Sequence, residues 1–373
     1  MVEIVEVITK KQIKEFLKFP NVLYKDCNYY SYPLAMDEKN MFNAKKNVAY
    51  KDCDVVLFLA YQDGKVAGRI AGIIQKAYNK KANSKVARFT RFDAVNSQEV
   101  ANALFDAVEK WAKNKGMETL VGPLGFNDLD VEGMIVEGFN ERCTFEERYN
   151  YEYYVSLMEN AGFTKDVDWL ERKIYPTETT EKVARVAEIC AKRYNLRFAK
   201  EKSKNELIEK YKKGIFDLVD EAYKDLYGTV PFTDEIREQL LGQFKTFVDL
   251  KFMIIVVNEK DEVVGFGVAL PALNNALFKS KGKLTLPALF RVLKALKKPK
   301  VVDFALLAVR PDYQTKGVNA FAIKYLMDNM AKFGVEYCET NICLEDNIKI
   351  NQTWQYFKHD QHRRRRSWKK ELV

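Results

Sequence analysis

The chain of 373 residues repeats one order of elements in its two halves, and this repeat limits the possible folds more than any other feature. Each half contains two apolar runs separated by a short polar turn, which is the pattern of a β-hairpin. These runs are 55–62 with 65–75 in the first half, and 252–257 with 263–270 in the second. A third strand and an amphipathic helix follow in each half, and a glycine, Gly116 or Gly334, ends the helix. The repeat predicts two domains of one fold, joined in tandem.

The third strand and its helix give each half a mixed architecture. They cover 86–92 and 97–115 in the first half, and 301–309 and 320–333 in the second. We predict an α/β chain of the mixed α+β kind, in which each domain is a mostly antiparallel twisted sheet flanked by helices. The predicted domains are 1–176 and 177–373.

The turn between strand and helix in the second half has the pattern of a phosphate-binding loop. An apolar run that ends at Val309 suits a buried strand, and Pro311 cannot donate to a strand ladder, so pairing stops there. Gln314-x-x-Gly317 then leads into the helix, whose first N–H groups lack intrahelical partners and attract anions. Gly317 also allows a close approach of the main chain. We therefore predict that this strand, loop and helix bind a pyrophosphate.

These residues resemble the signature of the GNAT acyltransferases, which use acyl-CoA to acylate an amine. The signature is a strand with hydrophobic-x-Val-x-Pro, followed by Gln/Arg-x-x-Gly-x-Gly/Ala at the start of a helix. The residues that match it are Leu307, Val309, Pro311, Gln314 and Gly317. Asn319 replaces the final small residue. The resemblance implies acetyl-CoA or another acyl-CoA as the cofactor, and two GNAT-like domains in the chain. The residues that it assigns to the cofactor are Leu307, Ala308, Val309, Gln314, Thr315, Lys316, Gly317, Val318, Asn319, Ala320 and Asn347.

The corresponding loop of the first half differs from this signature. The residues from Asp93 to Ser97 contain no Gln-x-x-Gly, and a carboxylate stands where an anion would lie. Ser97 has the character of an N-cap for the following helix. We therefore predict that the first domain has a GNAT-like fold with a degenerate cofactor site.

The resemblance implies direct attack of an amine on the thioester, with the backbone of 307–309 polarising the carbonyl group. On the following helix the family commonly has a tyrosine acid, but Trp354 stands at that position and Tyr356 lies at another helical angle. Glu339 and Glu345 are the candidate bases, because both lie near the end of the strand after the cofactor helix. The predicted catalytic residues are therefore Glu339, Glu345 and Tyr356. A solvated loop acid is the alternative for each glutamate.

Cysteine and histidine usage argues against metal and thiol chemistry. Six cysteines are scattered without a C-x-x-C pair, and the two histidines, His359 and His362, lie near the C-terminus. We expect neither a metal site nor a histidine-based triad. Cys338 and Cys343 have glutamates close in sequence, which raise a thiol pKa, so we expect no acyl-cysteine intermediate. We also expect a cytoplasmic protein, since no apolar run is long enough to cross a membrane and the N-terminal residues lack a signal-peptide pattern.

Much of the formal charge of +9 lies in the segments 279–300 and 363–370. Residues 284–300 have the pattern of a basic amphipathic helix, which we expect to cover a sheet, with contact to a membrane surface or a lipid-like acyl substrate as the alternative. Its predicted apolar face consists of Leu289, Val292, Leu293 and Leu296. We interpret the arginine run 363–366 as a solvated edge strand, with RNA binding as the alternative.

A segment rich in glycine and carboxylates, 122–139, has three possible interpretations. We favour a tight surface loop, and the alternatives are a carboxylate lip that attracts a cationic amine and a calcium loop. Asp128, Asp130 and Glu132 have calcium-loop spacing, but Phe139 stands where a bidentate glutamate is needed.

The sequence as a whole predicts an acyl-CoA-dependent N-acyltransferase, with acetyl as the favoured acyl group. The expected acceptor is a small-molecule or peptide amine, and nucleic acid is not an expected partner. Two alternatives stay open: an aminoacyl-tRNA-dependent transferase of the Fem type, which also has tandem GNAT-like domains, and a non-catalytic ligand-binding protein of this fold. The sequence leaves the oligomeric state open.

Overall fold

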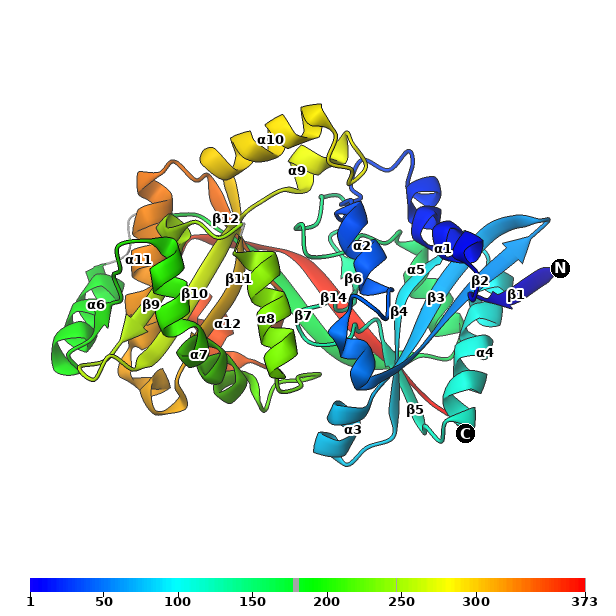
Figure 1. Ribbon diagram of the computed structural model, residues 1–373, viewed down its shortest axis with the longest axis horizontal. Coiled ribbons are helices and arrows are strands. Elements are labelled where there is room, and N and C mark those ends of the chain that lie inside the picture. The colour runs from blue at the N-terminus through cyan, green and yellow to red at the C-terminus, as the bar shows by residue number, and fades with distance from the viewer. Residues whose placement is uncertain (177–180, 246, 373) are drawn as a thin grey trace. The chain divides into compact units, whose positions relative to one another are not determined.

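The computed structural model describes residues 1–176, 181–245 and 247–372 (Figure 1). The chain forms two compact units. Unit 1 comprises residues 1–170, 274–289 and 363–373, and unit 2 comprises residues 171–273 and 290–362. The prediction of one domain boundary after Pro176 differs from this division, because each unit includes residues from the other half of the sequence.

Unit 1 is built on a sheet with the strand order β1-β2-β3-β4-β5-β14, and β6 pairs with β14. Its strands are β1 (Val2–Glu6), β2 (Cys53–Gln62), β3 (Lys65–Gln75), β4 (Val86–Ala94), β5 (Thr119–Gly122), β6 (Met134–Glu137), the first part of β7 (Thr164–Ile174) and the last part of β14 (His359–Glu371). Its helices are α1 (Lys10–Leu23), α2 (Ala35–Met41), η1 (Val48–Lys51), α3 (Lys76–Ala82), α4 (Gln98–Asn114), α5 (Tyr153–Asn160), α9 (Asn274–Phe278) and the start of α10 (Leu286–Lys297).

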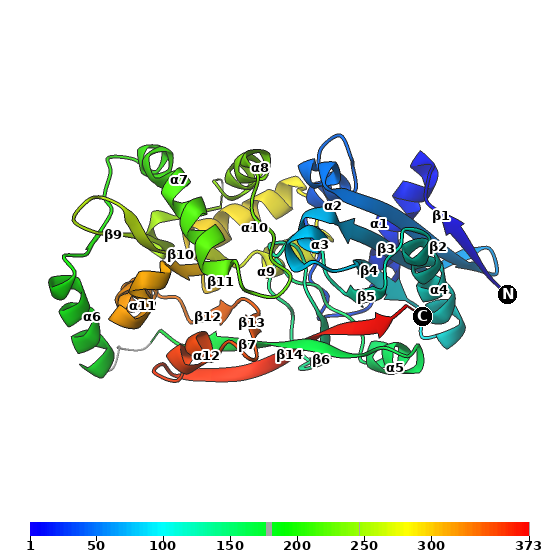
Figure 2. The ribbon, with the colours of Figure 1, turned by 90° about the horizontal axis from the view of Figure 1, so that it is seen from below.

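Unit 2 repeats this plan, with the strand order β7-β12-β11-β10-β9-β8. Its further strands are β8 (Arg197–Phe198), β9 (Met253–Val257), β10 (Val263–Pro271), β11 (Val301–Val309), β12 (Tyr337–Thr340) and β13 (Cys343–Leu344). Its helices are α6 (Glu181–Arg193), α7 (Lys204–Tyr223), α8 (Asp234–Phe244), η2 (Leu250–Phe252), the rest of α10, η3 (Pro311–Lys316), α11 (Val318–Lys332) and α12 (Ile348–Trp354). In this unit α7 and α11 lie on opposite faces of the sheet (Figure 2).

The two sheets share one irregularity, which positions the candidate site. Each is antiparallel except for one parallel pair, β4 with β5 and β11 with β12. The parallel pairing covers only the first residues of β4 and β11, namely 86–88 and 301–304. Both strands stay paired on their other side, where each contains a register shift that marks a β-bulge. The ends of β4 and β11 therefore part from their parallel neighbours.

Each unit has its own apolar core. The core of unit 1 includes Phe89, Phe105 and Trp368. The core of unit 2 packs Val302 and Phe304 of β11 against α11 and against Trp354 of α12. Within the described ranges, no helix combines the length and the apolar character needed to cross a membrane.

Candidate functional site

The end of β11 exposes a backbone edge in unit 2. Its pairing with β12 is confined to residues 301–304, whereas its pairing with β10 continues to Val309. The N–H of Arg310 donates to the carbonyl of Val264 in β10. Because backbone groups alternate between the two sides of a strand, the N–H and C=O groups of Leu307 and Val309 point away from β10. These are the positions that the sequence assigns to the acyl-CoA.

Two side chains already contact this edge. The Tyr223 hydroxyl, at the end of α7, donates to the Leu307 carbonyl at 2.9 Å. The amide of Gln314 donates to the Val309 carbonyl at 3.3 Å, and Lys349 donates to the other end of that amide at 3.0 Å. The Leu307 and Val309 carbonyls therefore already accept hydrogen bonds from side chains, and a ligand on this edge would replace these bonds or bind beside them. Tyr223 was not among the predicted site residues.

The loop after β11 forms the turn of 3₁₀-helix η3, and α11 begins directly after Gly317. No side chain caps α11, and the N–H of Phe321 makes the first intrahelical bond, to the Gly317 carbonyl. The N–H groups of Val318, Asn319 and Ala320 consequently belong to the first turn, where an anion is favoured.

Gly317 is required here for two local reasons. Its φ of 84° lies in the left-handed region, and a Cβ at this position would lie 3.1 Å from Val186 Cγ1 of α6. The glycine thus serves the turn and the packing against α6, and not only the approach of a ligand. Lys316 lies beside it, with its ammonium group over the rings of Tyr194 and Tyr313.

A buried cluster of acids and one histidine lies in the same unit. Glu339 of β12, Glu171 of β7 and His362 of β14 each bring one ligand atom to within 4.8 Å of the others. Nε2 of His362 is 2.8 Å from a carboxylate oxygen of Glu339. Glu171 is 0% and Glu339 is 4% exposed, so charge in this cluster is shielded from solvent. Asp303 of β11, in register with Glu339, is also buried.

Strand alternation places this cluster on the α7 face of the sheet. Cys338, next to Glu339, packs with Ile174 and with α11 in the apolar core. Since neighbouring side chains of a strand point to opposite faces, Glu339 points away from α11. Tyr223 reaches Leu307 from α7 on that same face. The acids, the histidine and the tyrosine therefore share the face of the sheet beside the open end of β11.

The predicted catalytic residues occupy different surroundings. Glu339 lies in the buried cluster. Glu345 is exposed in the loop before α12. Tyr356 is 48% exposed, and its ring lies 5.1 Å from the Lys182 ammonium on α6. The side chain of Asn347, predicted to bind the cofactor, instead caps α12 by accepting from the Ile350 N–H at 3.4 Å.

The sequence led us to expect neither a metal site nor a histidine-based triad, but the structure places His362 beside two buried glutamates. Glu171 is distant in sequence from Glu339 and His362, and the three side chains come together only in the folded chain. An imidazole and two carboxylates are suited to proton transfer, and they are also ligand types for a divalent metal.

Thiol chemistry is disfavoured by the surroundings of the nearby cysteines. Burial raises the pKa of Cys338 well above its ordinary value, and the carboxylates of Asp303 and Glu339 raise it further. Burial also raises the pKa of Cys343. A thiol with a raised pKa is a poor nucleophile at neutral pH, so these two side chains favour direct transfer.

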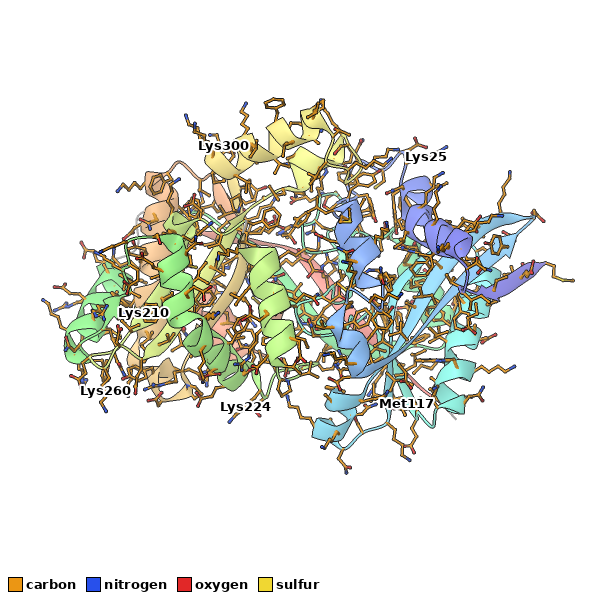
Figure 3. The ribbon with its side chains drawn as sticks, in the orientation of Figure 1. Lys25, Met117, Lys210, Lys224, Lys260 and Lys300 are labelled. Atoms are coloured by element: carbon orange, nitrogen blue, oxygen red, sulfur yellow. The ribbon has the colours of Figure 1, made fainter. Side chains whose placement is uncertain are left out.

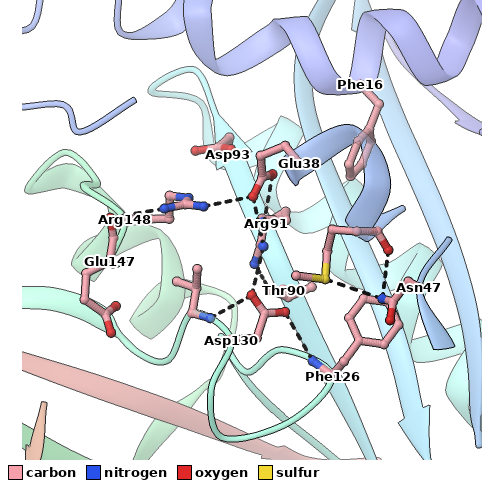
Figure 4. A network of polar contacts seen from close by, with 12 residues as sticks. Phe16, Glu38, Asn47, Thr90, Arg91, Asp93, Phe126, Asp130, Glu147 and Arg148 are labelled. Carbon is pink, nitrogen blue, oxygen red and sulfur yellow. Dashed lines mark hydrogen bonds and ion pairs between the residues drawn. The ribbon is translucent and has the colours of Figure 1, made fainter. Parts of the chain in front are cut away.

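In unit 1 the corresponding opening is filled by charged side chains (Figure 4). Arg91, at the bulge of β4 with a φ of 51°, forms ion pairs with Glu38 at 3.1 Å and with Asp130 at 3.0 Å. Arg148 adds a contact of 2.9 Å to Glu38. Burial alone would raise the pKa of Glu38, but Arg91 and Arg148 outweigh it and hold that pKa well below its ordinary value.

The end of β4 is also occupied. Asp93 accepts from Arg69 at 2.8 Å and from the Tyr24 hydroxyl at 2.9 Å. The N–H of Ala94 donates to the Tyr154 hydroxyl at 2.9 Å, and Tyr153 donates to the Ala94 carbonyl at 2.7 Å. The cavity left beside these groups measures about 40 Å³. Ser97 caps α4, as the sequence predicted.

The carboxylates of the loop after β5 point inward. Asp130 bonds Arg91 and the N–H groups of Phe126 and Val131. Glu132 is 5% exposed, and its pKa is raised well above the ordinary value by burial and by the neighbouring Asp128. Asp130 and Glu132 are thus structural groups, and the interpretation of this loop as an open carboxylate lip is wrong.

The arginine run of β14 is also structural. Arg363 and Arg365 are almost fully buried, and Arg364 and Arg366 both bond Asp168. The strand pairs with β5 and β6, so the prediction of a solvated edge strand is wrong. These arginines are engaged within unit 1, which disfavours a role in RNA binding.

Comparison with solved structures defines the class of fold. The chain is similar to a tandem GNAT protein from the clavulanic acid biosynthesis pathway, with a TM-score of 0.59 and 10% identity over 100% of this chain and 99% of that one. This chain therefore has the tandem GNAT fold, as the sequence predicted.

Two curated proteins match most of the chain at low identity. Protein YghO of Escherichia coli is 24% identical over 98% of this chain and 94% of its own length. A bacterial ceramide synthase of Caulobacter vibrioides is 26% identical over 84% of this chain and 81% of its own length. No family model matches the chain.

Proposed function

We propose that this protein is an acyl-CoA-dependent N-acyltransferase and that its reaction takes place in unit 2. The observation that carries the proposal is the open end of β11, which leads into the uncapped N-terminus of α11. A strand edge of this kind binds an extended amide-containing chain, and the helix N-terminus binds its phosphates. In unit 1 the same positions are filled by Arg91 and Asp93.

The buried cluster supplies the acid–base chemistry of the proposed reaction. The amine attacks the thioester carbonyl carbon as the neutral base, and its nitrogen must lose one proton as the amide forms. In our proposal the pair of His362 and Glu339 takes that proton as the C–N bond forms. The C–S bond then breaks, and the CoA sulfur leaves as a thiolate that takes up one proton. Tyr223, on the edge of β11, is the proposed donor of this proton.

The N–H groups on the β11 edge have a defined part in this scheme. Negative charge develops on the thioester oxygen as the amine attacks, and backbone N–H groups fixed in position stabilise it. The N–H groups of Leu307 and Val309 have the required orientation, because they point away from β10. Neither step requires an acyl-enzyme, in agreement with the raised pKa of Cys338.

The name of one relative suggests that both the acyl group and the acceptor amine carry long aliphatic chains. A ceramide is the amide of a fatty acid with a long-chain amino alcohol, and the relative carries the name of a ceramide synthase. We therefore extend the favoured acetyl group to fatty acyl groups and propose an amphiphilic primary amine as acceptor.

The test is an assay of the full chain with acyl-CoA thioesters from acetyl to palmitoyl and with long-chain amino alcohols. We expect free CoA thiol and amide product in equal amounts, with mass spectrometry identifying the amide. Calorimetry should give one CoA site per chain. A non-catalytic binding protein would bind CoA without releasing thiol, and a Fem-type transferase would need aminoacyl-tRNA. Failure of the chain to bind CoA would overturn the proposal.

A further inference from the structure

Helix α10 exposes a continuous apolar stripe to solvent. Leu286 is 75%, Leu289 is 42%, Phe290 is 73% and Leu293 is 52% exposed. Their spacing of three and four residues places them on one side of the helix. Single exposed apolar residues are common on protein surfaces, but four large ones on one side of a helix indicate an interaction surface.

The stripe is not the face by which α10 packs. Ala288 and Val292 are buried and lie on another side of the helix. The sequence predicted that Leu289, Val292, Leu293 and Leu296 would cover a sheet together, but only Val292 of these four is buried. The helix is thus held by one apolar face while a second, larger one stays in water.

The segment around the stripe is strongly cationic. Residues 279–300 contain eight basic and no acidic residues, against a net charge of +9 for the whole chain. The rest of the chain is therefore nearly neutral. Seven of these basic residues are exposed lysines: Lys279, Lys281, Lys283, Lys294, Lys297, Lys298 and Lys300. Figure 3 shows the side chains of this helix, with Lys300 labelled.

A groove of unit 1 continues this surface. It has a volume of about 1330 Å³ and lies between α1, α2 and the segment before α10. Its lining contains seven lysines, including Lys279, Lys281 and Lys283, and a single carboxylate, Glu38. Apolar side chains such as Leu17 and Phe42 form part of its wall. The lysines just before α10 in the chain thus line an opening large enough for an aliphatic chain.

We propose that α10 docks on the surface of an anionic lipid bilayer. An amphipathic helix binds such a surface by inserting its apolar side chains at the boundary between headgroups and acyl chains. Each lysine near the surface adds electrostatic attraction to anionic lipids. An acidic protein or a nucleic acid would match the charge, but it would leave Leu286, Phe290 and Leu293 without an apolar environment. This inference does not rest on the proposed acyl transfer.

Vesicle flotation with the full chain tests the inference. The probes are phosphatidylcholine vesicles and vesicles that also contain phosphatidylglycerol. We expect binding to the anionic vesicles, with weaker binding as salt is added because the attraction is screened. The variant with Leu286→Ser, Phe290→Ser and Leu293→Ser should bind about tenfold more weakly or worse. Lys294→Glu with Lys298→Glu should weaken binding to anionic vesicles only.

A matched control separates this face from apolar exposure in general. Ile189 and Ile348 are 54% and 63% exposed on α6 and α12, so Ile189→Ser with Ile348→Ser should leave vesicle binding unchanged. All substituted residues are exposed, and circular dichroism confirms that each variant is folded. The inference is overturned if the parent chain does not float with anionic vesicles or if the triple variant binds as the parent does. It is also overturned if the stripe instead mediates a dimer that the triple variant abolishes, without vesicle binding by the parent.

Discussion

In unit 1 the bulged strand that parts from its parallel neighbour carries Arg91 at the bulge, whereas in unit 2 the corresponding strand carries Ala305. Arg91 fills its opening and is fixed there by Glu38 and Asp130. Ala305 has only a methyl group as its side chain, which is too small to fill the space between β11 and β12. The same backbone irregularity therefore serves packing in one unit and offers a binding edge in the other.

The helices after these strands differ in the same way. Ser97 caps α4 with its side chain, which stabilises a helix by about 1 kcal/mol. Gly317 precedes α11 without any side-chain cap, and this is the place where we propose that phosphate binds. Unit 1 thus satisfies its own polar groups at the end of β4 and at the start of α4, whereas the start of α11 in unit 2 has no side-chain cap.

The largest effects should follow from removing a buried tryptophan from each core. Trp368 in unit 1 and Trp354 in unit 2 are 1% and 2% exposed, and a change of buried tryptophan to alanine costs about 3–5 kcal/mol. Hydrogen exchange should rise in α4 for Trp368→Ala and in α11 for Trp354→Ala. If either variant loosens both helices equally, the two cores do not have separate stabilities.

Glu38→Gln should destabilise unit 1 by about 3 kcal/mol, because it removes the carboxylate that pairs with Arg148 and leaves buried Arg91 with only one of its two ion pairs, the one to Asp130. The ligand affinity of unit 2 should not change. The pKa of Glu38 lies below its ordinary 4.5, so its contribution is complete above pH 4.5 and is lost as pH falls through the folded-state pKa. Chemical denaturation between pH 7 and 3 should therefore show a weaker acid dependence for Glu38→Gln. Equal pH dependence in both proteins would contradict this account of Arg91.

The repeat and the loop motif were predictable from the sequence because both depend on local patterns. Apolar alternation gives the hairpins, and Gln314-x-x-Gly317 gives the turn before α11. The helix cap of Ser97 is equally local, since only the residues that follow it are involved.

The acid–base cluster could not be predicted in this way. Glu171, Glu339 and His362 come from three strands, and β7 is far from the other two in sequence, so only the strand order brings the three side chains together. The inward orientation of Asp130 depends likewise on Arg91 and on the bulge that positions it. In the sequence, Tyr223 is only a tyrosine at the end of a long helix. Such tyrosines are too common to indicate a functional residue.

Removal of the cluster should affect turnover and leave binding intact. We expect Glu339→Gln and His362→Asn each to lower kcat by about a hundredfold, the usual contribution of a general base. The affinity for CoA should stay within about twofold, because neither side chain lies at the loop of Gly317. The pH profile of kcat should also change shape in both variants, which distinguishes proton transfer from a structural role. Unchanged kcat and pH profile in both would assign these residues to structure alone.

The smallest effect should come from one charge at the start of α11. Asn319→Asp keeps the size of the side chain and places a carboxylate beside the N–H groups proposed to bind phosphate. A carboxylate in the first turn stabilises a helix, so the melting temperature should stay the same or rise. Its repulsion of phosphate should nevertheless weaken CoA binding by about tenfold, or about 1.4 kcal/mol. The matched control is Asn96→Asp, directly before the cap of α4, where unit 1 should bind no phosphate. Calorimetry should be used to measure CoA affinity in both variants. If both bind CoA equally weakly, or if Asn319→Asp binds it as the parent does, then the phosphate is not bound specifically at the start of α11.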